Sequence, residues 1–249
     1  AWQQRFGYPE VGLHLFYAMN GSAQLGHALG LYPSIQFRLL QRNRLQWFFK
    51  FGGGLGYADR HWQRLPSVDT LDNIIGSHLN NFSMFQSGCR IRLSDHWVAH
   101  AGVDFYHLSN AAARTPNYGI NTYGLFGGAS WYPAGSPHTF LHQETPHTPN
   151  PFYAGCSLSV ALQEDKVPDG PLYVVRTVGG HVVKMYRHKN YVMAGIDAIY
   201  NDRVRALIRD ANFHKGSHYL SAWQYASYAG HEFLFGQIGF PLVAGVYLN

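Results

Sequence analysis

A histidine and a serine stand two residues apart at His107 and Ser109, and Asn110 follows them directly. On a β-strand, residues i and i+2 share a face, with Cα atoms roughly 6–7 Å apart. An imidazole nitrogen can then reach the hydroxyl, the pairing that activates a serine nucleophile. The side-chain amide or backbone N–H of Asn110 could donate to an oxyanion. The spacing thus fits a serine hydrolase, and, as the plainer alternative, two hydrogen-bonding residues at a strand end.

The stretch from His96 to Trp131 would position this pair. Its odd positions are apolar and its even positions mixed, which is the alternation typical of a β-strand with one apolar face; the apolar positions are Trp97, Ala99, Ala101, Val103 and Phe105. His107 and Ser109 continue the apolar face. If this face meets lipid, two polar side chains on it cost free energy. Such residues are then expected to have a function.

The next predicted strand, Gly119–Trp131, carries Asn121 near its start and Tyr123 on the same side. Hairpin-connected strands are antiparallel neighbours. We therefore expect Asn121 to lie close to His107, where it could orient the imidazole ring.

The composition favours a transmembrane β-barrel. Aromatic residues make up 16% of the 249 residues and charged residues 13%, while the mean hydropathy is only −0.20. The charged share is about half of that usual in soluble domains. Barrel strands show lipid only one face, and no apolar run approaches the roughly 20 residues of a membrane helix. A soluble β-sandwich is the alternative.

We expect a single all-β domain over residues 1–249, with one helical turn at Val204 to Arg209 and a turn at Ala229-Gly230. The predicted strands cover residues 8–19, 31–40, 45–57, 82–93, 96–109, 119–131, 152–162, 172–186, 191–200, 219–228 and 233–248. Because bacterial barrels have an even strand count, these eleven indicate an antiparallel barrel of about 12 strands.

The predicted connections mostly alternate between short and long. Short turns lie near Asn43, Asp95 and His188, whereas the long loops cover 60–78, 110–118, 164–170 and 201–216. Outer-membrane barrels have short periplasmic turns and longer outer loops. This assignment puts Ser109 at the outer rim, facing lipid, although the loop 133–151 breaks the alternation.

Net charge, cysteine content and the start of the chain add further expectations. The net charge is +5 and the basic residues are scattered, so anionic lipid or lipopolysaccharide is a better partner than nucleic acid. Cys89 and Cys156 lie in apolar alternations and are expected to be packing residues. The chain starts at Ala1 without Met or a signal peptide, so we expect a processed or truncated chain.

No metal or cofactor is expected. His138, His142 and His147 lie in the loop 133–151, which contains several prolines. We favour a solvated loop over a zinc site there, because no fourth ligand is evident. The glycines of 52–56 are followed neither by a helix pattern nor by the Lys-Ser/Thr of a phosphate loop.

The residues around Ser109 resemble a known family. Residues 106–111 read Tyr-His-Leu-Ser-Asn-Ala, and residues 116–121 read Pro-Asn-Tyr-Gly-Ile-Asn. These runs resemble the signature of the outer-membrane lipid A 3-O-deacylases, also labelled acyloxyacyl hydrolase-like proteins. The resemblance is specific over about 97–131, looser at 8–12 and 52–57, and slight past Pro151. The chain looks most like the larger, Bacteroidetes-type versions.

The resemblance implies an integral protein of the bacterial outer membrane that removes an ester-linked 3-hydroxyacyl chain from lipid A. Ser109 would be the nucleophile, His107 the general base, and Asn110 with the neighbouring amide of Ala111 the oxyanion site. Substrate contacts are expected at Phe105 and Tyr123 on the strands and at Arg114, which could meet lipid A phosphates.

One position departs from the family. Where the family has a glutamate after its Pro-Asn-x-Gly-Ile run, this chain has Asn121. Asparagine can hold a histidine tautomer but cannot stabilise an imidazolium by charge. The alternative function is therefore a catalytically inactive barrel that serves as a structural or accessory subunit of an outer-membrane complex. A barrel that binds or passes a small apolar ligand is a third reading, which rests on the fold alone.

Overall fold

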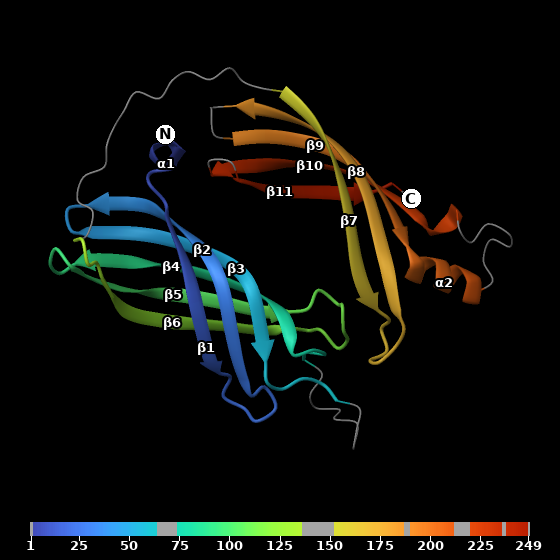
Figure 1. Cartoon of the computed structure of the whole chain (residues 1–249), viewed down its shortest axis with the longest axis horizontal. Helices are drawn as coiled ribbons and strands as arrows, with labels where there is room; N and C mark the ends of the chain where they lie inside the picture. The colour runs from blue at the N-terminus through green and yellow to red at the C-terminus, as the bar shows by residue number, and fades with distance from the viewer. Residues whose placement is uncertain are drawn as a thin grey trace. The chain divides into compact units, whose positions relative to one another are not determined.

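The chain forms eleven β-strands, two short α-helices and one 3-10 helix within the residues described, which are 2–63, 74–135, 152–186, 190–211, 220–235 and 238–248 of a computed structural model (Figure 1). The elements are α1 (Trp2–Arg5), β1 (Glu10–Met19), β2 (His27–Arg42), β3 (Leu45–Ala58), β4 (Leu79–Arg92), β5 (Trp97–Ser109), β6 (Ile120–Trp131), β7 (Phe152–Glu164), β8 (Leu172–Tyr186), β9 (Asn190–Asn201), α2 (Asp202–Asp210), η1 (Leu220–Ala222), β10 (Trp223–Phe235) and β11 (Ile238–Tyr247). The all-β prediction and its eleven strands are confirmed.

The strands form two antiparallel sheets. One has the order β1-β2-β3-β4-β5-β6, and the other has the order β11-β10-β9-β8-β7, so every neighbour within a sheet is also a neighbour in sequence. The chain divides into two compact units, one with residues 6–142 and 166–169, and one with residues 1–5, 143–165 and 170–249. We call them the N-terminal and C-terminal units after the sheets they carry.

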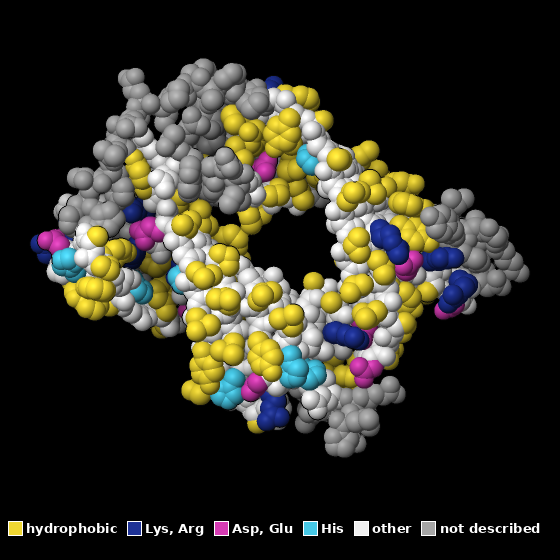
Figure 2. Space-filling model, in the orientation of Figure 1, with side chains coloured by type: hydrophobic (Ala, Val, Ile, Leu, Met, Phe, Trp, Pro, Cys, Tyr) yellow, Lys and Arg dark blue, Asp and Glu magenta, His cyan; other side chains and the backbone are white. Residues whose placement is uncertain are grey.

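Each strand of the N-terminal sheet has a packed face and an exposed face. On β1 the exposed side chains are apolar, with Val11, Leu13 and Leu15 each more than 70% exposed. The packed face holds a cluster of fully buried side chains that includes Phe82 and Leu108. Figure 2 shows hydrophobic side chains spread over much of the visible surface. Large apolar groups on the solvent-accessible side are what a sheet in contact with lipid presents.

No helix among the described residues is long and apolar enough to cross a membrane. The C-terminal sheet has a smaller buried cluster of Val183, Met185 and Tyr191. The predicted helical turn is part of the nine-residue α2, which begins at Asp202 because Asn201 caps it by accepting a hydrogen bond from the Arg203 N–H at 2.9 Å.

The predicted turn at Ala229-Gly230 is wrong. Strand β10 continues through both residues, which pair with β9 on one side and β11 on the other. A Cβ at position 230 would lie 2.2 Å from the carbonyl oxygen of Leu242. The glycine therefore allows close strand approach instead of a turn. The expected bounds of the last two strands shift accordingly, to 223–235 and 238–247.

Several predicted features lie outside the described residues. They are part of the loop 60–78, the residues 136–151 with His138, His142 and His147, and the turn at His188.

Candidate functional site

The predicted site lies where β5 ends and β6 begins. Side chains of β5 alternate, so Tyr106 and Leu108 are buried on the packed face while His107 and Ser109 lie on the other face with Val103. The two strands are antiparallel neighbours, and their register places His107 directly opposite Asn121. The structure thus brings the three residues together on the exposed face.

His107 bridges the other two side chains. Its Nε2 lies 2.8 Å from Ser109 Oγ, and its Nδ1 lies 2.8 Å from Asn121 Oδ1. The Asn121 amide nitrogen donates to the Gly119 carbonyl oxygen at 3.4 Å, which turns Oδ1 toward the ring. An amide oxygen only accepts, so Nδ1 carries the proton. Nε2 is then the acceptor for the serine hydroxyl, as a general base requires.

Gly119 supports the ring from the loop. It has φ +77°, and a Cβ there would lie 2.9 Å from His107 Cε1 and 2.8 Å from the Leu108 carbonyl oxygen. A side chain at this position would both strain the backbone and push the imidazole. Glycine is therefore needed for the position of His107, a requirement that the run 116–121 did not reveal by itself.

We expect Gly119→Ala to lower activity at least tenfold and stability by about 1–2 kcal/mol, because L-residues pay roughly that amount in the left-handed region and small displacements of a catalytic group are costly. Acyl release and thermal unfolding measure the two effects. Gly53→Ala is the control, since a Cβ at that position on β3 meets only a carbonyl oxygen, 3.8 Å away. Unchanged activity in Gly119→Ala would contradict the supporting role.

The side chain and the backbone N–H of Asn110 make three hydrogen bonds. Its side-chain Nδ2 donates to Ser77 Oγ at 2.8 Å, its Oδ1 accepts from the Arg114 backbone N–H at 3.3 Å, and its own backbone N–H donates to Asn117 Oδ1 at 3.1 Å. Asn110 thus fixes the loop that follows Ser109. Both donors that were expected to face an oxyanion have partners inside the protein.

Ser77 and Asn117 were not predicted as part of this region. Asn117 stands in the run 116–121 quoted above, but its partner could not be read from spacing. Ser77 precedes β4 and is 33 residues from Asn110 in sequence. Only the pairing of β4 with β5 brings the two together, because Asn81 lies opposite Ser109.

The residues after Asn110 have an unusual backbone. Ala111 and Ala112 both have positive φ, +54° and +63°. Non-glycine residues in this region are uncommon and often mark functional sites. Among the described residues, neither of their backbone N–H groups donates a hydrogen bond. Two backbone N–H donors, two and three residues after Ser109, therefore have no partner among the described residues.

The predicted substrate contacts lie near His107, Ser109 and Asn121, which we call the triad. On the exposed face, Phe105 contacts Tyr123 with ring centroids 4.7 Å apart, and Tyr123 is 81% exposed. Their row continues through Phe85 on β4 to Phe51 on β3, because the four residues are cross-strand partners. Arg114 is exposed in the loop between β5 and β6.

No carboxylate of the described residues forms an ion pair with His107. Asp104, the nearest acidic residue along β5, lies on the packed face and accepts from Gln86 Nε2 at 3.5 Å. The described residues also contain no group of three or more His, Cys, Asp or Glu side chains that could hold a metal ion.

Comparison with known proteins identifies the N-terminal half. No curated protein and no solved structure showed significant similarity to the chain. The family model described as lipid A 3-O-deacylase (PagL) matches residues 1–130, which include all of β1–β5 and the triad on β5 and β6. The match covers just over half of the 249 residues and confirms the resemblance seen at residues 106–121. The chain therefore belongs to the lipid A 3-O-deacylase family.

Proposed function

We propose that this protein is a serine esterase of the bacterial outer membrane that removes an ester-linked 3-hydroxyacyl chain from lipid A. The observation that carries the proposal is the bridging position of His107, 2.8 Å from both Ser109 Oγ and Asn121 Oδ1 on an apolar face. The family membership supports the substrate class.

In the proposed reaction, Ser109 Oγ attacks the ester carbonyl carbon while His107 Nε2 takes the hydroxyl proton. The tetrahedral oxyanion is stabilised by the N–H groups of Ala111 and Ala112, which have no other partner among the described residues. His107 then gives the proton to the departing sugar oxygen. Water, activated by the same imidazole, releases the hydroxyacid and restores the serine. No cofactor takes part.

Asn121 limits this chemistry. It holds His107 in the tautomer with the proton on Nδ1, but it brings no negative charge to the imidazolium formed during attack. In a serine protease, replacement of the aspartate by asparagine lowers kcat by about 10⁴ through the wrong histidine tautomer, a loss that Asn121 avoids here. Because the charge is missing, we still expect slow turnover compared with a triad that contains a carboxylate.

The position of the site along β5 supports a place at the outer leaflet. Trp97 and Trp131 are cross-strand partners at the far end of the hairpin, 47% and 60% exposed, where an aromatic girdle is expected. His107 lies ten residues further along β5, or roughly 33 Å along the strand. At a barrel tilt of 35–45° this is about 25 Å across the membrane, the height of the apolar band.

This placement extends to the whole fold. We propose that the strands belong to a closed transmembrane barrel of about 12 strands in one domain, since barrels of this class have an even number of strands. A lipid A ester would then reach Ser109 from within the leaflet. Phe105 and Tyr123 would contact the acyl chain, and Arg114 a lipid A phosphate.

Mass spectrometry of lipid A after incubation with the purified protein tests the proposal. Loss of one hydroxyacyl chain is the expected result. Unchanged lipid A would contradict the enzyme and favour the second candidate, an inactive barrel that serves as a subunit of an outer-membrane complex. Asn121, in the place of the family's glutamate, is the observation that favours this candidate.

A further inference from the structure

A cavity of about 170 Å³ lies on the packed face of the N-terminal unit, which is the opposite face from His107 and Ser109. Side chains from β1 to β6 line it, and most of them are polar. The catalytic proposal uses none of these residues. Their donors and charges indicate what the cavity could hold.

Two neighbouring polar side chains in the cavity lack partners. Gln36 on β2 and Lys50 on β3 are cross-strand partners, so their side chains lie side by side. The Gln36 Nε2 atom is buried and has no hydrogen-bond partner. Lys50 is half-buried, and none of the described residues forms an ion pair or hydrogen bond with its ammonium group. Buried donors and buried cations are unfavourable unless an acceptor or a counter-charge satisfies them.

Further donors face the same space. His14 on β1 and Ser34 on β2 are hydrogen bonded to each other at 2.7 Å, and both line the cavity. His100 on β5 also lines it, packed against the Phe126 ring at 6.1 Å. The donors therefore come from several strands and point into the cavity from several directions.

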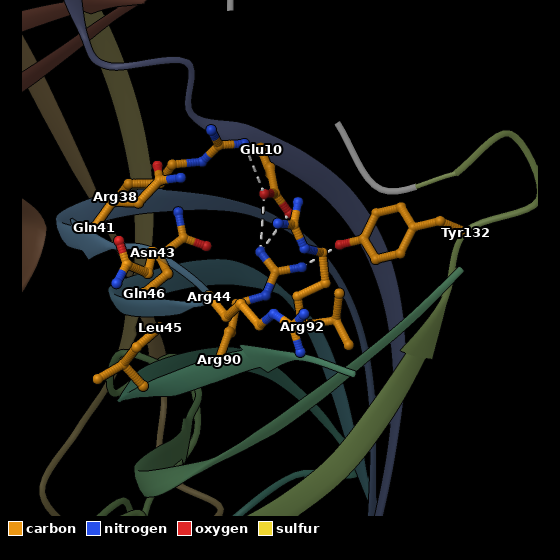
Figure 3. A pocket seen from close by; sticks show the side chains of 11 residues that line it. Glu10, Arg38, Gln41, Asn43, Arg44, Leu45, Gln46, Arg90, Arg92 and Tyr132 are labelled. Carbon is orange, nitrogen blue, oxygen red and sulfur yellow. Dashed lines mark hydrogen bonds and ion pairs between the residues drawn. The ribbon is translucent and has the colours of Figure 1, made fainter. Parts of the chain in front are cut away.

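The charge around the cavity is positive. Glu10 is its only acidic lining residue, and the carboxylate accepts from Arg38 at 3.1 Å and from Arg90 Nη1 at 2.8 Å. Figure 3, which draws the adjoining pocket, shows both guanidinium groups directed at this carboxylate, with Tyr132 beside Arg90. Arg90 and Lys50 line the cavity, whereas Arg38 lines the adjoining pocket. Asp104 is separated from Lys50 by Gln86 in the register of the sheet and does not line the cavity.

We infer that this cavity binds a phosphate-type oxyanion. A tetrahedral oxyanion offers acceptors in several directions, which matches donors that arrive from β1, β2, β3 and β5. Its negative charge supplies a direct ion pair for Lys50, which has only the more distant carboxylates of Glu10 and Asp104 nearby among the described residues. The source is either free phosphate or the phosphate of a lipid headgroup, since both present the same oxygens.

Calorimetric titration of the detergent-solubilised full chain with inorganic phosphate, at low ionic strength, tests the inference. We expect saturable binding of one equivalent. Lys50→Met should weaken it about tenfold or more, because a charge-assisted bond is lost, and Gln36→Leu about fivefold. Lys184→Met on β8, outside the cavity, is the control and should bind as the unsubstituted protein does. Far-UV circular dichroism verifies that each variant is folded.

A second arm separates the two sources. The protein is placed in nanodiscs of phosphatidylglycerol or of phosphatidylcholine, and bound lipid is measured by ³¹P NMR. Binding of inorganic phosphate in detergent identifies the free ion. Binding only of phosphatidylglycerol, with loss in Lys50→Met, identifies a headgroup. No saturable binding in either arm, or equal binding by the folded Lys50→Met and Gln36→Leu variants, would overturn the inference.

The oxyanion site is independent of the esterase proposal. Ser109→Ala leaves the packed face unchanged, so it should bind phosphate with the same affinity. Loss of deacylation with retained phosphate binding would therefore separate the two sites.

Discussion

Ser109→Ala should lower kcat for release of the hydroxyacyl chain by roughly 10² or more, because the triad members act as a unit and this triad already lacks the charge of a carboxylate. The alanine removes the only hydroxyl bonded to His107 Nε2 in the described residues. His107→Ala should be as damaging, because nucleophile and base act as one unit. The measurement is free hydroxyacid, quantified by mass spectrometry over a long incubation.

Ser83→Ala provides a matched control. Ser83 lies on the same face and is the β4 cross-strand partner of His107, but its hydroxyl donates to Asn81 Oδ1 at 3.1 Å. Its removal should leave the rate near that of the unsubstituted protein. Retained activity in Ser109→Ala, or a loss confined to Ser83→Ala, would show that Ser109 is not the nucleophile.

Asn121→Glu should raise activity by about 10²-fold, because a carboxylate stabilises the imidazolium by charge; this is less than the roughly 10⁴ lost when the serine protease aspartate becomes asparagine, where the tautomer also changes. The substituted carboxylate would start from the same β6 position, opposite His107, and could accept the Nδ1 proton. It would then stabilise the imidazolium as the serine is deprotonated. Asn121→Ala should instead fall below the unsubstituted rate, because the tautomer is no longer held. Initial rates of hydroxyacid release compare the three proteins.

Asn81→Glu distinguishes a specific contact from general charge. Asn81 is the cross-strand partner of Ser109, so the added carboxylate would lie near the site but not at Nδ1. We expect no gain from it. Equal rates for Asn121→Glu and the unsubstituted protein would show that charge at this position does not limit turnover. Inactivity of both would support the accessory-subunit reading.

The exposed-face position of His107 could be predicted from sequence because strand geometry is local. A period of two determines which side chains share a face, and the apolar residues from Trp97 to Phe105 label that face. The proximity of Asn121 followed from a hairpin with antiparallel pairing. Both inferences needed only the identities of residues on two adjacent strands, and the structure has the expected placement.

Other features depend on contacts that no local pattern contains. Asn110 looked like an oxyanion donor, but Ser77, from the segment before β4, takes its side-chain N–H. Gly230 looked like a turn because glycine is common in turns and also where strands approach closely. Sequence alone does not distinguish these two uses, since the deciding neighbour is the Leu242 carbonyl on another strand.

In the proposed transmembrane barrel, the amide at position 121 has a consequence for insertion into the bilayer. With asparagine there, the side chains of His107, Ser109 and Asn121 carry no formal negative charge, and a carboxylate on a lipid-facing wall opposes insertion to a degree that grows with depth. A neutral relay can therefore lie deeper in the hydrocarbon than a charged one. Slow hydrolysis and easy assembly would then have the same origin in one side chain.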